Sequence, residues 1–427
     1  MSDRNQHLDD RAVASLGTQL KGRRIDLVVS AGIACLETPK LVRELRRYGA
    51  EVRVALTPKV TNFVSPLCFE WASGHGVLGE LSGAAEHLSH ADAVVIAPCT
   101  LDFLSKISTG LADSAAATLI QSVLGRRPVL VQPSMHSSLE ENPIYQKNLR
   151  TLMELPFVKI LSAREEESKR KVPDVRETAR EICHLINQHY RKDKIGRLLL
   201  LMGPTRSYLD DVRYISNYSS GRTGFAIADH FYRWGWTPDI VSGPVSINFP
   251  EIWSVGHVEN INEIEPVAGE LLKKHKYHGI IFAAALLDFE VTSQIEGKRN
   301  SKSSWAFELK PTRKLIQHLG KDVPIRVGFK LEFARDSVSL TRLIKEAADK
   351  NQCEIVVGNN LEDINETNHP VQIYIRSEGR IMEARNNQEL SDILVSTMES
   401  LTGRNKKSQK RNAADNPKPS SSAISEA

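Results

Sequence analysis

The strongest constraint on the fold is an alternation of short apolar runs with amphipathic helical stretches. The first series contains the strand-like runs RIDLVVS, EVRVALT, DAVVIAP and RPVLVQP. Their Val, Ile and Leu residues follow one another without the polar alternation of a strand that has one face in water. The stretch TPKLVRELRRYGA follows the first run and predicts a helix that stops at Gly49. Four apolar residues lie on one face of this helix, namely Leu41, Val42, Leu45 and Tyr48. Buried strands separated by helices predict a parallel sheet that is covered on both faces.

The alternation stops at a charged, apolar-poor link, HYRKDKIGR, and then begins again. The second series contains LLLLMG, DIVSG, GIIFAAA and CEIVVGN. We therefore predict an α/β protein with two doubly wound parallel-sheet domains, at residues 23–190 and 196–402. A polar N-terminal extension at residues 1–22 precedes them. A disordered tail at 403–427, rich in Lys, Ser, Asn and Pro, follows them.

The composition excludes several classes of protein. The chain has 427 residues and a net charge of only +4, too small to indicate nucleic-acid binding. Its five cysteines are scattered without a CxxC pair, which favours a reducing compartment and no structural zinc site. No apolar run approaches the ~20 residues of a membrane span, and the N-terminus lacks a signal-peptide pattern. We expect a cytoplasmic protein that binds neither nucleic acid nor membranes.

The stretch ISNYSSGRTGFAIADHF, residues 215–231, combines a small polar loop with the start of a helix. Its second half places Ile227 and Phe231 at helical spacing. The first turn of a helix has free N–H groups and a partial positive charge, so this loop could bind an anion. Alternatively, Ser219 or Ser220 simply caps the helix. Because ligands of doubly wound sheets bind at the carboxyl ends of strands, the loops after strands are where a site is expected.

Neither domain contains the GxGxxG pattern of dinucleotide-dependent dehydrogenases, which disfavours that chemistry. The segments GPTRSYLDDVRYISNYSSGRTGFAIA, VSGPVS, AAALLDF, Lys298 and VGFKLE, in this order, closely resemble the phosphopantothenate–cysteine ligase family of coenzyme A biosynthesis. The resemblance implies a Rossmann-like fold. It also implies that a nucleoside triphosphate activates 4′-phosphopantothenate, releasing pyrophosphate, and that the amine of cysteine then attacks the acyl-nucleotide.

The resemblance also implies roles for individual residues. It assigns catalysis to Lys298, Asn217 and Arg213, and binding of the substrate phosphate to Ser219, Ser220, Gly221 and Arg222. It assigns binding of the nucleotide to Gly243, Ala284, Asp288, Lys298 and Phe329. Each also has a simpler interpretation: Lys298 as a solvated lysine, Asn217 as a turn residue, Arg213 as half of a surface salt bridge, and Ala284 and Phe329 as core.

The resemblance also implies a metal ion and limits the choice of nucleotide. Magnesium is expected, because the leaving group is pyrophosphate. The base stays open between CTP and ATP. FKLE and PTRKL resemble the eukaryotic ligases that use ATP, and the CTP-using pattern has Pro-Asp where Arg313 and Lys314 stand.

The first domain resembles phosphopantothenoylcysteine decarboxylases, which are flavodoxin-like FMN enzymes. The resemblance lies in VVSAGIACLETPKLVRELRRYGAEVRVALT and ADAVVIAPCTLDFLSKISTGLAD. It implies that FMN contacts Ser30, Gly32, Thr57 and Thr100. Fusion to the ligase is the arrangement of the bifunctional bacterial family. In that family the first unit trimerises and the ligase unit dimerises, so we also expect a homo-oligomer.

The first domain departs from the decarboxylase pattern at three chemical positions. Ala84 stands where the family has a histidine, and His87 is the nearest substitute. His136 replaces the asparagine of PxMN, and LSAREEESKRKVPD, with neither Cys nor Gly, replaces the flap that carries the catalytic cysteine. Cys183 falls on an apolar helix face and is predicted to be core.

These departures predict a ligase whose decarboxylase-like domain is degenerate. One alternative is a fully bifunctional enzyme that uses His87 and His136 in altered roles. Another is a non-catalytic regulatory module that binds flavin or nucleotide, which the presence of Asn217 and Lys298 disfavours.

Overall fold

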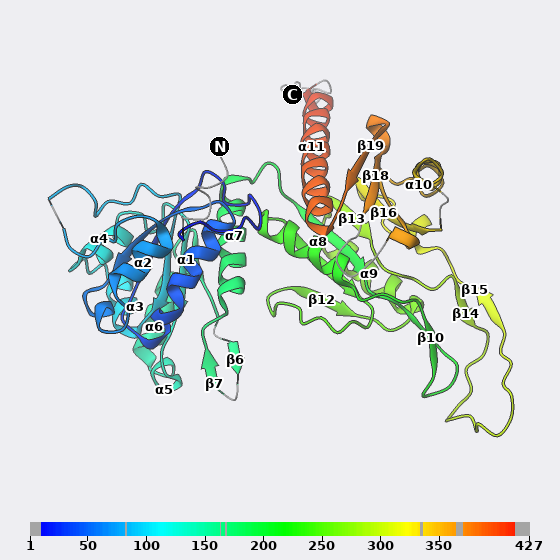
Figure 1. Ribbon diagram of the computed structural model, residues 1–427, viewed down its shortest axis with the longest axis horizontal. Helices are drawn as coiled ribbons and strands as arrows, with labels where there is room; N and C mark the ends of the chain where they lie inside the picture. The colour runs from blue at the N-terminus through cyan, green and yellow to red at the C-terminus, as the bar shows by residue number, and fades with distance from the viewer. Residues whose placement is uncertain are drawn as a thin grey trace, which may run out of the picture. The chain divides into compact units, whose positions relative to one another are not determined.

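The computed structural model describes residues 10–81, 83–162, 164–166, 169–333, 336–363 and 370–414, without the side chains of 163–171 and 404–427. The chain forms two compact units, and the first unit ends at Arg191, within the charged link (Figure 1). Each unit is built on a largely parallel sheet with helices, which confirms the predicted fold class.

The first unit contains a five-stranded parallel sheet with the order β2-β1-β3-β4-β5. This is the flavodoxin-like strand order. The strands are β1 (Arg24–Val29), β2 (Glu51–Leu56), β3 (Ala93–Cys99), β4 (Val129–Pro133) and β5 (Val158–Ile160). The helices are η2 (Ile33–Glu37), α1 (Thr38–Arg47), η3 (Pro58–Asn62), α2 (Pro66–Ser73), α3 (Leu101–Ser108), α4 (Ala115–Gln121), α5 (Ser137–Glu140), α6 (Pro143–Met153) and α7 (Val175–Tyr190).

Both faces of this sheet are covered, which explains why its strands are largely apolar. In β1, Leu27 and Val29 belong to the core shared with α1 and α7, whereas Val28 belongs to the core shared with α3, α4 and α6. Side chains of a strand alternate between the two faces of the sheet. A strand with a core on each side therefore has mainly apolar residues at consecutive positions.

The N-terminal extension is less separate than its composition predicts. Leu20 is fully buried in the same core as α1. The backbone N–H groups of Leu16 and Leu20 donate to the carbonyls of Arg47 and Tyr48, both at 2.9 Å. Burying one leucine side chain contributes about 2 kcal/mol, enough to hold a short segment in place. Residues 16–20, at the end of the predicted polar extension, are therefore held against the first domain by the buried side chain of Leu20 and by backbone hydrogen bonds.

The second unit contains an eight-stranded sheet with the order β12-β11-β8-β13-β16-β17-β18-β19. The strands from β12 to β17 are parallel, and β18 and β19 continue the sheet antiparallel. The sheet consists of β8 (Arg197–Met202), β11 (Thr237–Ser242), β12 (Ser254–His257), β13 (Gly279–Phe282), β16 (Ile325–Glu332), β17 (Ile355–Asn360), β18 (Val371–Ile375) and β19 (Arg380–Ala384). Its helices are α8 (Arg222–Arg233), α9 (Ile261–Lys274), η4 (Leu315–Gln317), α10 (Ser337–Asn351), η5 (Leu361–Asp363), η6 (Arg376–Glu378) and α11 (Asn387–Ala414).

Two small antiparallel pairs extend from this sheet. The first joins β9 (Arg206–Tyr208) to β10 (Tyr214–Ser216), and the second joins β14 (Phe289–Val291) to β15 (Leu309–Pro311). Figure 1 shows β10, β14 and β15 projecting together from one end of the second unit. Both pairs leave the sheet after its central strands, β8 and β13, and therefore lie close to the predicted site.

The last helix begins inside the second domain and continues past its predicted end. Leu390, Leu394 and Met398 recur at i, i+4 and i+8 and are buried, so they fix α11 against the sheet. The helix continues to Ala414, so residues 403–414 are helical and the prediction of disorder is wrong for them; 415–427 lie outside the described residues. The Lys, Arg, Gln and Ala of this stretch are good helix formers, which composition-based prediction of disorder disregards. Among the described helices, none is both long and apolar enough to span a membrane.

Candidate functional site

The loops that follow β8, β11, β13 and β16 meet at one edge of the second sheet. These strands are parallel and in register, with Met202 opposite Ser242 and Phe282 opposite Gly328. The residues that leave these strands must therefore lie side by side. Three of the residues predicted to bind a nucleotide fall at this edge: Gly243, Ala284 and Phe329.

Gly243 is glycine because two chain segments cross there without space for a side chain. A Cβ atom at Gly243 would lie 1.7 Å from the carbonyl oxygen of Pro204. The N–H of Gly243 donates to the carbonyl of Met202 at 2.9 Å, which fixes the two strand ends together. The loops at this edge are thus packed backbone against backbone, and this leaves little freedom for the residues that they carry.

Replacing Gly243 by alanine should destabilise the second domain by about 3 kcal/mol, because a backbone segment must move to relieve the contact. The measurement is urea-induced unfolding of the full chain. Gly269 is the matched control, since it lies in α9 and a Cβ added there would meet no neighbouring atom within 4 Å. Gly269→Ala should instead stabilise by about 0.5–1 kcal/mol, the usual gain from glycine to alanine in a helix. Equal stability of Gly243→Ala and the native chain would contradict the packing argument.

The polar loop before α8 has the geometry of an anion-binding loop. Gly221 has φ of 73°, and α8 begins at the next residue, Arg222. A Cβ at Gly221 would lie 2.7 Å from Cγ1 of Val245, so glycine is required for both its conformation and its packing. The hydroxyl groups of Ser219 and Ser220 accept only long contacts, both 3.4 Å, from the N–H groups of Gly221 and Arg222. The serines therefore cap the turn weakly, and their hydroxyl protons stay available to a ligand, so anion binding by this loop stays a prediction.

Asn217 connects this loop to the segment that follows β13. Its side-chain nitrogen donates to the carbonyl of Leu286 at 2.8 Å and contacts that of Ala285 at 3.4 Å. The N–H of Ala285 in turn donates to the carbonyl of Gly203 at 2.9 Å. The exposed amide of Asn217 is therefore held in one orientation, with its oxygen without a partner among the described residues.

Lys298 and Arg213 lie on two segments that are tied to each other. Arg213 donates to the carboxylate of Asp210 at 2.6 Å and to the carbonyl of Arg299 at 3.3 Å. The ion pair expected from the sequence therefore exists, although its acid is buried rather than at the surface. Lys298 is exposed, and within the described part of the chain its ammonium group has no ion-pair or hydrogen-bond partner. This ammonium is available to an anionic ligand.

Asp288 lies at the end of the loop after β13 and is already paired. Its carboxylate binds the ammonium of Lys314, and both side chains are exposed. The backbone also closes here, since the N–H of Thr312 donates to the carbonyl of Asp288 at 2.9 Å. A nucleotide that uses Asp288 must therefore share it with Lys314 or displace that lysine.

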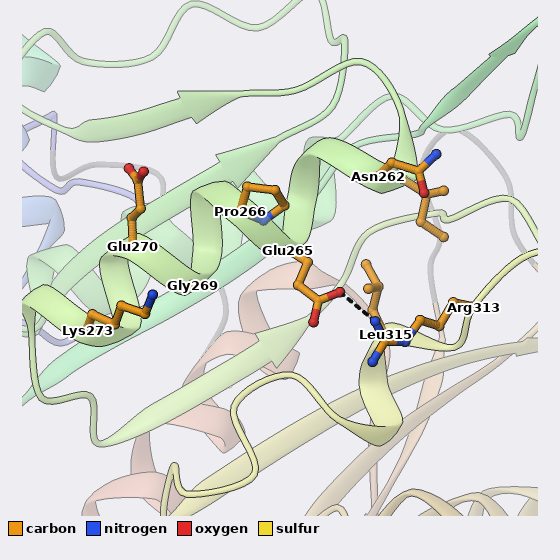
Figure 2. A pocket seen from close by; sticks show the side chains of 9 residues that line it. Asn262, Glu265, Pro266, Gly269, Glu270, Lys273, Arg313 and Leu315 are labelled. Carbon is orange, nitrogen blue, oxygen red and sulfur yellow. Dashed lines mark hydrogen bonds and ion pairs between the residues drawn. The ribbon is translucent and has the colours of Figure 1, made fainter.

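A cavity of about 650 Å³ lies along α9, but it does not coincide with the predicted site. Figure 2 shows that α9 lines one side and that Arg313 and Leu315 close the other. Arg313 forms an ion pair of 3.0 Å with Glu265 across this groove. Apart from Arg313, which stands in the segment that bears on the choice of base, no described residue that lines this cavity was assigned to substrate or nucleotide, so the site stays predicted at the strand ends.

In the first unit, the four residues predicted to contact FMN lie at the carboxyl ends of β1, β2 and β3. The buried hydroxyl of Ser30 donates to the carbonyl of Pro98 and accepts from the N–H of Thr100, both at 2.8 Å. A Cβ at Gly32 would lie 3.2 Å from Cγ2 of Thr100, so a larger residue would narrow this edge. The hydroxyls of Thr57 and Thr100 are half-buried and have no hydrogen-bond partner among the described residues. These three positions suit a flavin, whereas the proton of Ser30 is used by the fold.

Similarity to known proteins identifies the family of this chain. Residues 13–187 match the family described as Flavoprotein, and residues 194–401 match the DNA/pantothenate metabolism flavoprotein C-terminal domain. The chain is 30% identical over 398 residues to the coenzyme A biosynthesis bifunctional protein CoaBC of Thermococcus kodakarensis, covering 91% of this chain and 98% of that protein. The chain belongs to the CoaBC family. The protein of the same name from Methanocaldococcus jannaschii is also 30% identical, covering 90% and 94%, and that of Escherichia coli K12 is 27% identical, covering 88% and 96%.

The structure describes the surroundings of Ala84, His87 and His136, where the first domain of this CoaBC family member departs from the decarboxylase pattern. Residues 83–90, around Ala84 and His87, form turns and bends without a helix. His136 caps α5, because its Nδ1 accepts the N–H of Ser138 at 3.2 Å and must be unprotonated to do so. Cys183 is fully buried in α7, as predicted.

Within the segment that stands in place of the cysteine-bearing flap, two short strands pair. β6 (Arg164–Glu166) pairs antiparallel with β7 (Lys169–Lys171). The prediction of a solvated, charged run concerns side chains that lie outside the described residues. The pairing of β6 with β7 was not predicted, because two runs of three charged residues contain none of the apolar residues that indicate a strand.

Two polar residues of the CoaBC ligase domain were missed by sequence reasoning. Asp210 and Thr205 are buried, and Thr205 Oγ1 accepts the N–H of Leu287 at 3.0 Å. The pattern LDDVR contained a signal for Asp210, since an aspartate followed by free N–H groups two and three residues later favours a side-chain turn. Among the described residues, no group of three or more His, Cys, Asp and Glu side chains could hold a metal ion.

Proposed function

We propose that the second domain joins 4′-phosphopantothenate to cysteine at the expense of a nucleoside triphosphate, in coenzyme A biosynthesis. The observation that carries this proposal is the bond from Asn217 to the carbonyl of Leu286. It brings the phosphate-type loop before α8 against the segment after β13, where a nucleotide is expected. Membership of the CoaBC family supports the same reaction.

The chemistry requires two anions to approach each other. The carboxylate oxygen of phosphopantothenate attacks the α-phosphorus, the bond to the β-phosphate oxygen breaks, and pyrophosphate leaves. The amine of cysteine then attacks the acyl carbon, the nucleoside monophosphate leaves, and the amine proton passes to solvent. Lys298 would neutralise the phosphates, and the oriented amide of Asn217 would hold the mixed anhydride. Mg²⁺ would enter with the triphosphate and screen the same charges.

The test is an assay of the full chain with phosphopantothenate, cysteine and Mg²⁺, with either CTP or ATP as the nucleotide. We expect 4′-phosphopantothenoylcysteine and one pyrophosphate per product, identified by mass and by a coupled assay. The comparison of CTP with ATP determines the base preference that the sequence leaves open. Product in the absence of either nucleotide, or none with both, would refute the proposed reaction.

Arg222→Ala should raise KM for phosphopantothenate roughly tenfold, because a hydrogen-bonded charge contributes about 1.5–3 kcal/mol to binding an anion. KM for cysteine should change little, since cysteine has no phosphate. The exposed Arg342, which pairs with Glu346 on α10, provides a matched control for loss of an arginine. If pantothenate without its phosphate reacts as well as phosphopantothenate, the loop is only a helix cap.

For the first domain, we propose an FMN site at Gly32, Thr57 and Thr100 and a degenerate decarboxylase centre. When bound, FMN would supply oxidation of the substrate thiol, which makes loss of carbon dioxide possible. The half-buried, unpartnered threonine hydroxyls support binding of a polar cofactor. Three observations support degeneracy: residues 83–90 lack a helix, His136 acts as a cap, and residues 161–174 contain no cysteine.

The second candidate function is the complete bifunctional enzyme, which also converts phosphopantothenoylcysteine to 4′-phosphopantetheine. The observation that favours this candidate is the length of a relative that the chain covers. The match to the Thermococcus kodakarensis protein, called bifunctional, extends over 98% of that protein and includes its first domain. The two candidates differ in whether 4′-phosphopantetheine is formed with turnover.

A further inference from the structure

A buried carboxylate connects the two segments that carry Arg213 and Lys298. Asp210 is fully buried and lies in the turn between β9 and β10. One of its oxygens accepts the N–H groups of Val212 and Arg213, at 2.9 and 2.7 Å. The other accepts the guanidinium of Arg213 at 2.6 Å and the backbone N–H of Arg299 at 3.2 Å. One side chain therefore binds its own turn and also the neighbour of Lys298.

We propose that Asp210 is a positioning residue, which fixes the segment 295–299 so that the ammonium of Lys298 meets the triphosphate. This inference rests on the proposed ligase function. It assigns to Asp210 a role that acts through Lys298 and involves no contact with substrate.

Other contacts show that the segment is held along its length. The N–H of Ile295 donates to the carbonyl of Leu209 at 3.0 Å, and that of Gly297 donates to Asp211 at 2.9 Å. The guanidinium carbons of Arg213 and Arg299 lie 5.8 and 5.2 Å from the ring centre of Trp305. The segment is thus bound on both sides of Lys298, while Lys298 itself stays unpaired within the described residues. A free charge on a fixed backbone is the arrangement that preorganised electrostatic stabilisation requires.

The charge state of Asp210 suits this role. Burial alone would raise its pKa, but donation from Val212, Arg213 and Arg299 stabilises the carboxylate and holds the pKa at about 2. A folded-state pKa below the unfolded value of about 3.9 means that the stabilisation is complete above that value. It is lost only as the pH falls towards 2, so the contacts persist throughout the pH range of an enzyme assay.

The first arm of the test is kinetic. Asp210→Asn should lower kcat roughly 10²-fold, because a displacement of about 1 Å at a reacting group has an effect of that size. KM for phosphopantothenate should stay within about twofold, since the phosphate loop before α8 does not contact Asp210. The matched control is Asp239→Asn: Asp239 is also buried and binds Arg197 at 3.1 Å and Tyr277 at 2.7 Å, but it lies on β11 away from the site. Well below both melting temperatures, Asp239→Asn should leave kcat unchanged.

The second arm separates positioning from a general structural role. In a chain that already carries Lys298→Ala, adding Asp210→Asn should lower kcat by less than about threefold, because a residue that acts through Lys298 has nothing left to position. If the two effects multiply, Asp210 acts on something other than Lys298, and the proposal is refuted.

The third arm does not depend on enzymatic activity. Hydrogen exchange measured on peptides of the full chain should become faster over residues 295–302 in Asp210→Asn and stay unchanged in Asp239→Asn, because the N–H of Arg299 loses its acceptor. Unchanged exchange over 295–302 would refute the anchoring. A native chain that exchanges as expected but forms no phosphopantothenoylcysteine would refute the ligase proposal alone.

Discussion

Lys298→Ala should lower the rate of pyrophosphate release by about 10²–10³, the usual effect of removing one electrostatic contact to a transition state. The reason is local. The ammonium of Lys298 is exposed and unpaired within the described residues, so no neighbouring group neutralises it before substrate arrives. The measurement is pyrophosphate release under saturating phosphopantothenate, nucleotide and Mg²⁺.

Lys302→Ala is the matched control, since Lys302 is exposed on the same segment and its side chain is not assigned to the site. Its loss should change the rate less than twofold, as is usual for surface charges. A rate for Lys298→Ala equal to that of Lys302→Ala would remove Lys298 from the mechanism.

The full chain, supplied with FMN, should form no 4′-phosphopantetheine from 4′-phosphopantothenoylcysteine and should release at most about one carbon dioxide per bound FMN. Loss of carbon dioxide leaves an enethiolate that must be reprotonated inside a closed site. Residues 161–174 provide no cysteine to supply that proton. Trapping of carbon dioxide and the mass of 4′-phosphopantetheine are the measurements, and ligase turnover by the same preparation shows that the protein is intact.

His136→Asn is an informative variant, because it restores the asparagine of the family pattern. It should not restore decarboxylation, since the proton donor is still missing. Formation of 4′-phosphopantetheine by the native chain would instead establish the bifunctional enzyme. A yellow protein without that product would agree with binding of FMN at Thr57 and Thr100 and with a degenerate centre.

The α/β fold class could be predicted from the sequence, because burial of both faces of a sheet makes consecutive residues of each strand apolar. β1 is apolar at Leu27, Val28 and Val29, since consecutive residues face different cores. The start of α8 could be predicted to within two residues from the serine-rich loop, since Ser219 or Ser220 was the expected N-cap and the helix begins at Arg222. The antiparallel strands β18 and β19 could not be distinguished by their apolar pattern from further parallel strands.

The parts of the site that escaped prediction depend on contacts between distant segments. The LDDVR sequence indicates only the local turn around Asp210, and the approach of Arg299 gives this carboxylate a partner outside that turn. Leu20 reads as one apolar residue in a polar extension until α1 is present to cover it. Asn217 and Lys298 were found through resemblance, since a turn asparagine and a surface lysine have no distinguishing local pattern.

The order of the strands has a consequence for synthesis of this chain on the ribosome. β13 starts at Gly279 but pairs with β8, and β16, which ends at Glu332, completes the row beside it. The row of strand ends beside Asn217 is therefore complete only when translation has passed Glu332. Until Phe282 has been made, the edge of β8 that carries Leu200 lacks its neighbour β13. Pairing between distant strands is slow and leaves strands unpaired. The longest pairing of the second domain joins Leu198 to Gly279, 81 residues apart, whereas that of the first joins Ile25 to Ala93, 68 residues apart, so we expect the nascent second domain to depend on chaperones more than the first.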